Sequence, residues 1–182
     1  MIPVGYMAKR VRPSPDWLQA TSVLDVYSVS ACISDDFADY ISYWQHNGYW
    51  FFDSPAIIQQ LAQAYELSLQ ETNLFYYEVH NLEFDATKNQ WAPFKPEPRV
   101  TTQVIVPSEK VLEGYDVVTF YARANAECSP LSCNALAIEI NTNQHCLLAS
   151  LTEAQQLLEG GQFQHAEPGP YRIFAVYSLG WP

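Results

Sequence analysis

The sequence predicts an α+β fold in which a single domain, residues 1–182, combines a largely antiparallel sheet of about eight strands with about three helices. Apolar residues recur at helical spacing in some segments and alternate in others, which indicates both element types. Several alternating segments lie close enough in the sequence to form hairpins. The length of 182 residues and the hydrophobic content of 48% are enough for one packed core. A weak internal boundary is expected near the prolines at 93–98.

Near the N-terminus, two strands and a helix are expected. Residues 3–12 and 23–31 are rich in strand-forming side chains. A helix is predicted from Ser34, a suitable N-cap, to the stop signal Asn47-Gly48. Its apolar face has i, i+3, i+4 and i+7 spacing and consists of Phe37, Tyr40, Ile41 and Trp44.

The middle of the chain is expected to form a second helix and a hairpin. Ser54 followed by Pro55 is typical of a helix start, and the apolar face continues to about Glu66. Beyond this point the period changes to two over residues 74–79, which predicts a strand, and residues 86–90 suit the following turn.

The last part of the chain is expected to be strand-rich. Ser150 with Glu153 forms a capping box that begins a third helix, and Gly160-Gly161 ends it. Further strands are predicted at residues 100–106, 115–122, 135–140, 145–150 and 171–179.

The net charge of −11 lies in one continuous stretch, residues 13–87, which we call the acidic segment. This stretch contains no lysine and no arginine. It must pair with cations elsewhere in the chain, remain solvated or meet a cationic partner. The basic patch of Lys9, Arg10 and Arg12 is expected to pair with it. Its eleven carboxylates are those of Asp16, Asp25, Asp35, Asp36, Asp39, Asp53, Glu66, Glu71, Glu78, Glu83 and Asp85.

The composition argues against several classes of partner and compartment. Nucleic acids and anionic membranes are bound by basic surfaces, which an acidic chain lacks. The sequence has no apolar run of about 18 residues and no secretory signal at residues 1–12. We therefore expect a cytoplasmic protein with no nucleic-acid or membrane partner. The four cysteines, which are then expected to be reduced, are Cys32, Cys128, Cys133 and Cys146.

The candidate binding site is the aromatic and acidic stretch at residues 35–53. The helical face described above is explained by core packing. The remaining aromatic and polar residues cannot share that face, and Trp and Tyr are typical interface anchors. The predicted partner-binding residues are Asp35, Asp36, Asp39, Tyr43, His46, Asn47, Tyr49 and Trp50.

The cysteines allow several interpretations. Cys128 and Cys133, with His145 and Cys146, could supply four zinc ligands, but zinc sites usually have closer spacing. His145 and Cys146 are adjacent and would point to opposite faces of a strand. A nucleophilic cysteine would need a nearby base or cation, and a Cys128–Cys133 disulfide would need an oxidising compartment. We therefore expect small apolar core residues and no metal site.

No catalytic signature is evident. Glu78 and His80 share one face of a predicted strand, and a carboxylate can orient an imidazole, but a solvent-facing strand produces the same alternation. The chain lacks the motifs of phosphate-binding loops, dinucleotide-binding folds, serine hydrolases and zinc proteases. We assign no catalytic residue and no cofactor.

The sequence therefore favours a non-enzymatic binding protein that uses its acidic, aromatic-rich surface against a basic partner protein. A small acidic α+β domain of this kind resembles bacterial toxin-immunity proteins in general type, without a shared motif. Carboxylates would steer association and aromatic side chains would anchor it. One alternative is a small enzyme or ligand-binding domain with a pocket between the aromatic helix and the sheet. The other is a structural subunit of a homo-oligomer.

Overall fold

The computed structural model describes residues 1–41, 45–97, 100–120 and 127–182, which form a single α+β domain as predicted. The strands are β1 (Ile2–Arg10), β2 (Arg12–Pro13), β3 (Asp25–Val26), β4 (Asp35–Asp36), β5 (Asn73–Asp85), β6 (Gln90–Pro93), β7 (Val111–Thr119) and β8 (Tyr171–Leu179). The α-helices are α1 (Pro55–Ala64), α2 (Pro130–Cys133) and α3 (Leu151–Glu159), and the short 3₁₀ helices are η1 (Phe37–Tyr40) and η2 (Leu136–Ile138).

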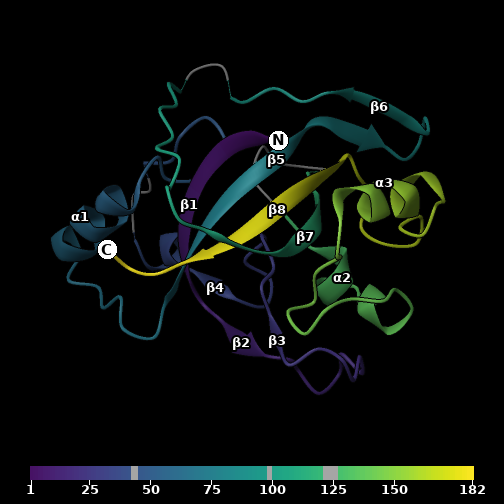
Figure 1. Cartoon of the computed structure of the whole chain (residues 1–182), viewed down its shortest axis with the longest axis horizontal. Coiled ribbons are helices and arrows are strands. Elements are labelled where there is room, and N and C mark those ends of the chain that lie inside the picture. Colours follow the sequence, from purple (N-terminus) through teal and green to yellow (C-terminus); the bar gives the residue numbers. More distant parts are fainter. Residues whose placement is uncertain (42–44, 98–99, 121–126) are drawn as a thin grey trace.

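One antiparallel sheet organises the molecule. Its strands follow the order β4-β1-β5-β8-β7, and β6 pairs with the C-terminal end of β5. The long strand β5 is central, and its Tyr76 lies opposite Tyr6 of β1 and Tyr177 of β8. The sheet is strongly twisted, as Figure 1 shows where β1, β5 and β8 cross the centre of the molecule.

Two apolar clusters build the core. The larger one surrounds β1, β5 and α1 and includes Tyr6, Phe75 and Ile58. The smaller one joins β7 and β8 to α3 through residues such as Val117 and Leu158. Helix α1 therefore lies at one end of the sheet and α2 and α3 at the other (Figure 1). Among the described residues, no helix combines the length and apolar character that a membrane span requires.

The elements with strong local signals are confirmed. Helix α1 begins at Pro55, directly after Ser54. At the start of α3, Ser150 Oγ accepts a hydrogen bond from the Glu153 N–H at 3.1 Å. The Glu153 carboxylate in turn accepts from the N–H of Ala149 at 3.0 Å, so the capping box is present in slightly shifted form. Strand β8 matches the predicted range 171–179.

The helix predicted over residues 34–47 is wrong. Asp35 and Asp36 form strand β4 and pair with the basic end of β1. A single 3₁₀ turn, η1, follows and ends at Tyr40, and residues 42–44 of the predicted helix lie outside the described residues. Hydrogen bonds and charge pairing across the two strands therefore outweigh the helix-start signal of the two aspartates.

Four predicted strands are mostly absent from the described residues. Residues 23–31 contribute only the short β3, because much of their backbone bonds to side chains of β1 and β7. Residues 135–140 contain η2, and Ala135, the residue before this helix, has a left-handed backbone conformation. Residues 145–150 make one bridge to β7, and residues 100–106 form no regular element.

Candidate functional site

Three of the four cysteines meet at one place. The Sγ atoms of Cys32, Cys128 and Cys133 all lie within 4.8 Å of one another, and we call these residues the cysteine cluster. Cys32 is exposed, Cys133 is half-buried and Cys128 is buried, so the cluster extends from the surface into the interior. In the part of the chain that the structure describes, no other group of His, Cys, Asp or Glu side chains is arranged to hold a metal ion.

One member of the cluster, Cys133, ends helix α2, and another, Cys128, precedes it by two residues. Cys128 lies beside the end of β7, where its carbonyl accepts a hydrogen bond from the Thr119 N–H at 2.9 Å. Pro130 occupies the first helical position, where its missing N–H costs no hydrogen bond. The single turn brings Cys133 back, with its N–H donating to the Ser129 carbonyl at 2.8 Å. The backbone pairing of Cys128 with Thr119 and the single turn of α2 together place both thiols in the cluster.

Lys9 fixes the loop that carries Cys32. The Lys9 side chain is 1% exposed and forms an ion pair with Asp36 at 2.8 Å. A buried ammonium group requires such partners, because removing an unpaired charge from water is very unfavourable. The Lys9 Nζ also donates to three consecutive carbonyls, at 2.6 Å to Ser28, 3.0 Å to Val29 and 2.8 Å to Ser30. Lys9 therefore holds the backbone just before Cys32 in one conformation.

Asp116 of β7 ties this loop to the segment that carries Cys128. The Oδ2 atom of Asp116 accepts hydrogen bonds from the Val29 N–H at 2.8 Å and from Ser129 Oγ at 2.6 Å. Ser129 Oγ accepts in turn from the Ser30 N–H at 3.2 Å. One buried carboxylate therefore holds both of the segments that supply thiols.

The thiols carry charge unequally. Hydrogen bonds from Cys128 and Cys133 lower the pKa of Cys32 far below its usual value, and the Lys9 charge acts in the same direction. Hydrogen bonds to Cys133 and Cys32, together with burial, raise the pKa of Cys128. These neighbours therefore favour the thiolate form of Cys32 and the protonated form of Cys128.

The carboxylates beside the cluster are also perturbed. Burial raises the pKa of Asp36 to about 6, although the Lys9 charge opposes the shift. Burial likewise raises the pKa of Asp116 to about 6, against the hydrogen bonds from Ser129 and Val29. Among the described residues next to the cysteine cluster, Lys9 is thus opposed by two buried carboxylates whose raised pKa values reflect the cost of burying negative charge.

Three converging thiols are a donor set for a soft metal cation. Zn²⁺ binds cysteine sulfur at about 2.3 Å in tetrahedral sites, which places sulfur atoms about 3.8 Å apart. The sulfur atoms here lie within 4.8 Å, so they would need to approach one another by about 1 Å at most. Small side-chain adjustments are sufficient for a movement of this size.

Of the four zinc ligands considered from the sequence, Cys128 and Cys133 meet, whereas His145 and Cys146 lie elsewhere. His145 Nδ1 is in hydrogen-bond contact with Asp25, and its ring stacks on Tyr27 with centroids 4.0 Å apart. Cys146 is buried in the smaller apolar cluster. The third thiol is instead that of Cys32, which donates to a carbonyl 95 residues away in the chain. Nothing in the spacing of Cys32 indicates this partnership.

The predicted partner-binding residues divide into two groups. Asp35, Asp36 and Asp39 lie together on β4 and η1. Asp35 pairs with Arg12 and Asp36 pairs with Lys9, as expected for the basic patch, whereas Asp39 is exposed. Two of the three aspartates therefore have cationic partners within the chain.

The second group forms the turn after residue 45 and consists of His46, Asn47, Tyr49 and Trp50. The rings of His46 and Trp50 stack with centroids 3.7 Å apart. Asn47 is buried, donates to the Val4 carbonyl at 2.9 Å and accepts from the Tyr49 N–H at 2.9 Å. Asn47 therefore stabilises the turn from inside. Tyr43 lies outside the described residues.

Basic side chains from outside the acidic segment pair with six of its eleven carboxylates. Five of these partners are lysine or arginine and one is histidine. The segment therefore relies on the rest of the chain for much of its neutralisation. The pairs are Asp25–His145, Asp35–Arg12, Asp36–Lys9, Glu78–Lys110, Glu83–Arg172 and Asp85–Lys88.

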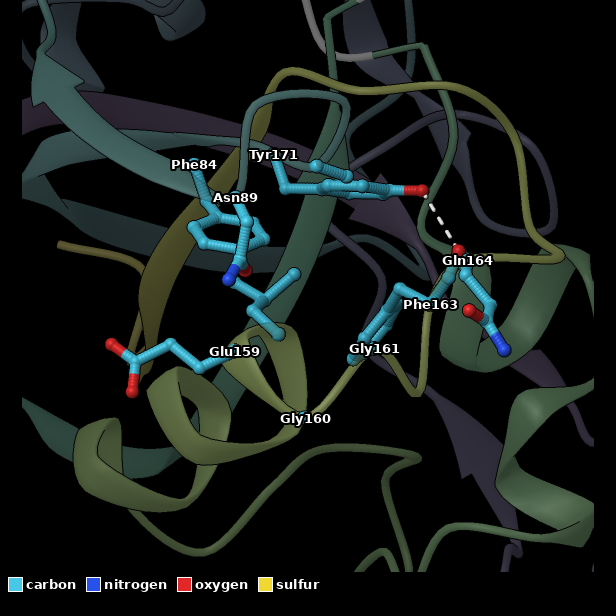
Figure 2. A pocket seen from close by; sticks show the side chains of 10 residues that line it. Phe84, Asn89, Glu159, Gly160, Gly161, Phe163, Gln164 and Tyr171 are labelled. Atoms are coloured by element: carbon cyan, nitrogen blue, oxygen red, sulfur yellow. Dashed lines mark hydrogen bonds between the residues drawn. The ribbon is translucent and has the colours of Figure 1, made fainter.

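A separate hollow of about 250 Å³ lies at the end of α3 (Figure 2). The Tyr171 hydroxyl lies 2.6 Å from the Glu167 carbonyl, and the Glu159 carboxylate accepts from Trp91 Nε1 at 2.7 Å. These polar groups are therefore engaged in the fold, and the hollow is a weaker candidate than the cysteine cluster. Its apolar lining consists of Phe84, Leu158, Phe163 and Tyr171.

Comparison with protein-family models, curated proteins and solved structures finds no match for this chain. The chemistry of the cysteine cluster therefore has to be inferred from its own distances, burial and charges.

Proposed function

We propose that the protein binds Zn²⁺ through Cys32, Cys128 and Cys133, as a binding protein and not an enzyme. The main observation behind this proposal is that three of the chain's four thiols lie within 4.8 Å of one another. Thiolates are preferred ligands of soft and borderline cations, and three of them are a common zinc donor set. Thiolate coordination requires a reducing compartment, so the proposal places the protein in the cytoplasm.

Exposure and charge support metal binding over simple packing. A cysteine that packs as a small apolar residue is normally buried, whereas Cys32 is exposed and its sulfur lies beside two others. Metal-bound cysteines must be deprotonated, and the lowered pKa of Cys32 favours that state, whereas zinc would have to displace the protons of Cys128 and Cys133, whose pKa values are raised. Lys9 and Asp116 hold the two contributing segments in place, which reduces the entropy lost when an ion binds.

The test is a zinc titration of the full-length protein after reduction and removal of metal with a chelator. We expect one Zn²⁺ per chain. Cys32→Ser, Cys128→Ser and Cys133→Ser should each lower the affinity at least about a hundredfold, because losing a direct ligand costs more than losing an outer-shell partner. Competition with a chromophoric chelator measures these affinities.

The matched control is Cys146→Ala, which removes the remaining cysteine and leaves the cluster intact. This variant should bind zinc as the unmodified chain does. Circular dichroism of each serine variant separates loss of a ligand from loss of the fold. Folded Cys32→Ser protein with undiminished zinc affinity would contradict the proposal.

A second candidate function is binding of a basic partner protein, as in a bacterial toxin-immunity or inhibitor protein. The observation that favours it is a hollow that β4, η1 and the loop at 67–72 line together with Arg10 of β1. Asp39, Glu66 and Glu71 are exposed and lie on or next in sequence to these segments. Such a surface would accelerate association with a cationic partner.

Reversing the charges of Asp39, Glu66 and Glu71 to lysine tests this surface, with poly-L-lysine as the cationic probe. Stopped-flow association should slow at least about tenfold at low salt and should lose much of its salt dependence. The matched control reverses Asp16, Glu109 and Glu139, three exposed acids in other parts of the chain. Equal slowing in both triple variants would mean that net charge alone matters, which would contradict this second function.

A further inference from the structure

The cysteine cluster supplies three donors, one fewer than a tetrahedral zinc ion takes. In the described part of the chain, no histidine, aspartate or glutamate ligand atom joins the three sulfur atoms within 4.8 Å. By sequence, residues 42–44, 98–99 and 121–126 include no Cys, His, Asp or Glu. His145 is held by Asp25 and Tyr27, as described above. Among Cys, His, Asp and Glu side chains, the described residues therefore offer no fourth ligand beside the three thiols.

The burial of the three thiols indicates where that ligand would enter. Cys128 is 7% exposed, and the Asn134 side chain lies 3.6 Å from its sulfur. Ser30 Oγ lies 3.8 Å from the sulfur of Cys133. Protein atoms thus cover the inner members, whereas Cys32 is exposed. An ion held by the three sulfur atoms would present its remaining position on the solvent side, and zinc sites with such a position take ligands from solution.

The charges around the cluster favour a neutral fourth ligand over an anionic one. Three thiolates and one Zn²⁺ carry a net charge of about −1. The Lys9 charge is already opposed by Asp36, and that of Arg12 by Asp35. The whole chain carries a net charge of −11. An anionic fourth ligand would therefore be repelled, whereas a neutral imidazole is a good zinc ligand that adds no charge.

We propose that the zinc ion held by Cys32, Cys128 and Cys133 keeps an open, solvent-side position that accepts a neutral imidazole from a histidine of a partner protein. The inference rests on the proposed zinc-binding function and adds a route by which the metal would bind a second molecule. The metal site would then be an attachment point and not a closed structural site.

The experiment uses the full-length reduced protein loaded with Co²⁺, whose visible absorption reports the ligands of a thiolate site. Imidazole and azide serve as probes, because both bind metals through nitrogen and only azide is anionic. We expect imidazole to shift the visible cobalt bands in a saturable way. Azide should bind at least about tenfold more weakly, because like charges repel at close range. Cys146→Ala should respond as the unmodified chain does.

The outcomes separate the two proposals. If cobalt binds with thiolate charge-transfer bands that depend on Cys32 but imidazole leaves the visible bands unchanged, the open position is disproved and the metal site stands. If azide binds as tightly as imidazole, the selection of a neutral ligand is disproved. If no thiolate-to-cobalt band forms at all, the zinc proposal fails and this inference fails with it.

Discussion

The acidic segment and the cysteine cluster handle charge in different ways. In the acidic segment, six carboxylates meet lysine, arginine or histidine side chains from other parts of the chain, and the pairs are distributed over the molecule. In the cysteine cluster, three thiols meet at one point, and the nearby Lys9 is already paired with Asp36. The difference shows that density of charge along the chain does not by itself create a need for a partner. Three gathered thiols offer a binding site only to a cation that can displace their protons, whereas the dispersed carboxylates are largely matched within the chain.

Burial separates the ion pairs of the acidic segment further. The side chains of Lys9 and Asp36 are 1% and 15% exposed, whereas those of Lys88 and Asp85 are 70% and 33% exposed. Water screens an exposed pair, but the removal of one buried partner leaves the other charge without compensation. The same lysine also holds the loop of the cysteine cluster, so it connects the two regions.

The largest expected effect follows from replacing this lysine. Lys9→Met should lower the free energy of unfolding by about 3 to 5 kcal/mol, because Asp36 and three carbonyl groups lose their buried partner. Denaturant unfolding at pH 7 measures the change. Methionine has a similar length, so packing is largely conserved.

The matched control is Lys88→Met, which removes the exposed lysine of the pair with Asp85. Its free energy of unfolding should equal that of the unmodified chain within experimental error. Similar destabilisation by both substitutions would break the distinction between a buried, structural pairing and a solvated one. It would also remove the reason for assigning Lys9 a positioning role at the cysteine cluster.

The sequence predicts well those elements whose signals are local. Helix α1 follows from a serine and a proline at its start, and α3 follows from the Ser150 capping box. Strand β8 follows from a run of apolar and aromatic residues between turns. In each case the deciding interactions lie within a few residues of one another, so no knowledge of the sheet is needed.

Elements decided by distant contacts are not predictable in this way. Asp35 and Asp36 have the local chemistry of a helix start, but pairing with β1 makes them a strand. Cys32 has no neighbour that marks it as a ligand, and its partners follow about a hundred residues later in the chain, beyond strand β7. The acidic segment is evident in the sequence, but the basic residues that pair with its carboxylates depend on the strand order of the sheet, which the sequence does not predict.

A smaller effect concerns Asp116, which joins the two segments of the cysteine cluster. Burial raises its pKa in the folded protein from 3.8 to about 6. The folded state therefore binds the proton more tightly than the unfolded state does, and stability falls as pH rises from about 4 to 6. Asp116→Asn cannot ionise and should remove about 2 to 3 kcal/mol of that decline. Denaturant unfolding at half-unit pH steps measures the slope.

The slope is more informative than the stability at one pH, because asparagine alters the hydrogen bonds to Val29 and Ser129 by an amount that does not vary with pH. Asp36 has a raised pKa as well, so part of the decline should remain in the variant. The control is Asp85→Asn, since the exposed Lys88 lowers the pKa of Asp85 and shifts its titration below this window. If the pH dependence of the unfolding free energy is unchanged in Asp116→Asn, ionisation of the Asp116 carboxylate does not destabilise the folded protein. The environment of the cysteine cluster would then be less hostile to negative charge than its burial implies, and the preference for a cation and a neutral fourth ligand would weaken with it.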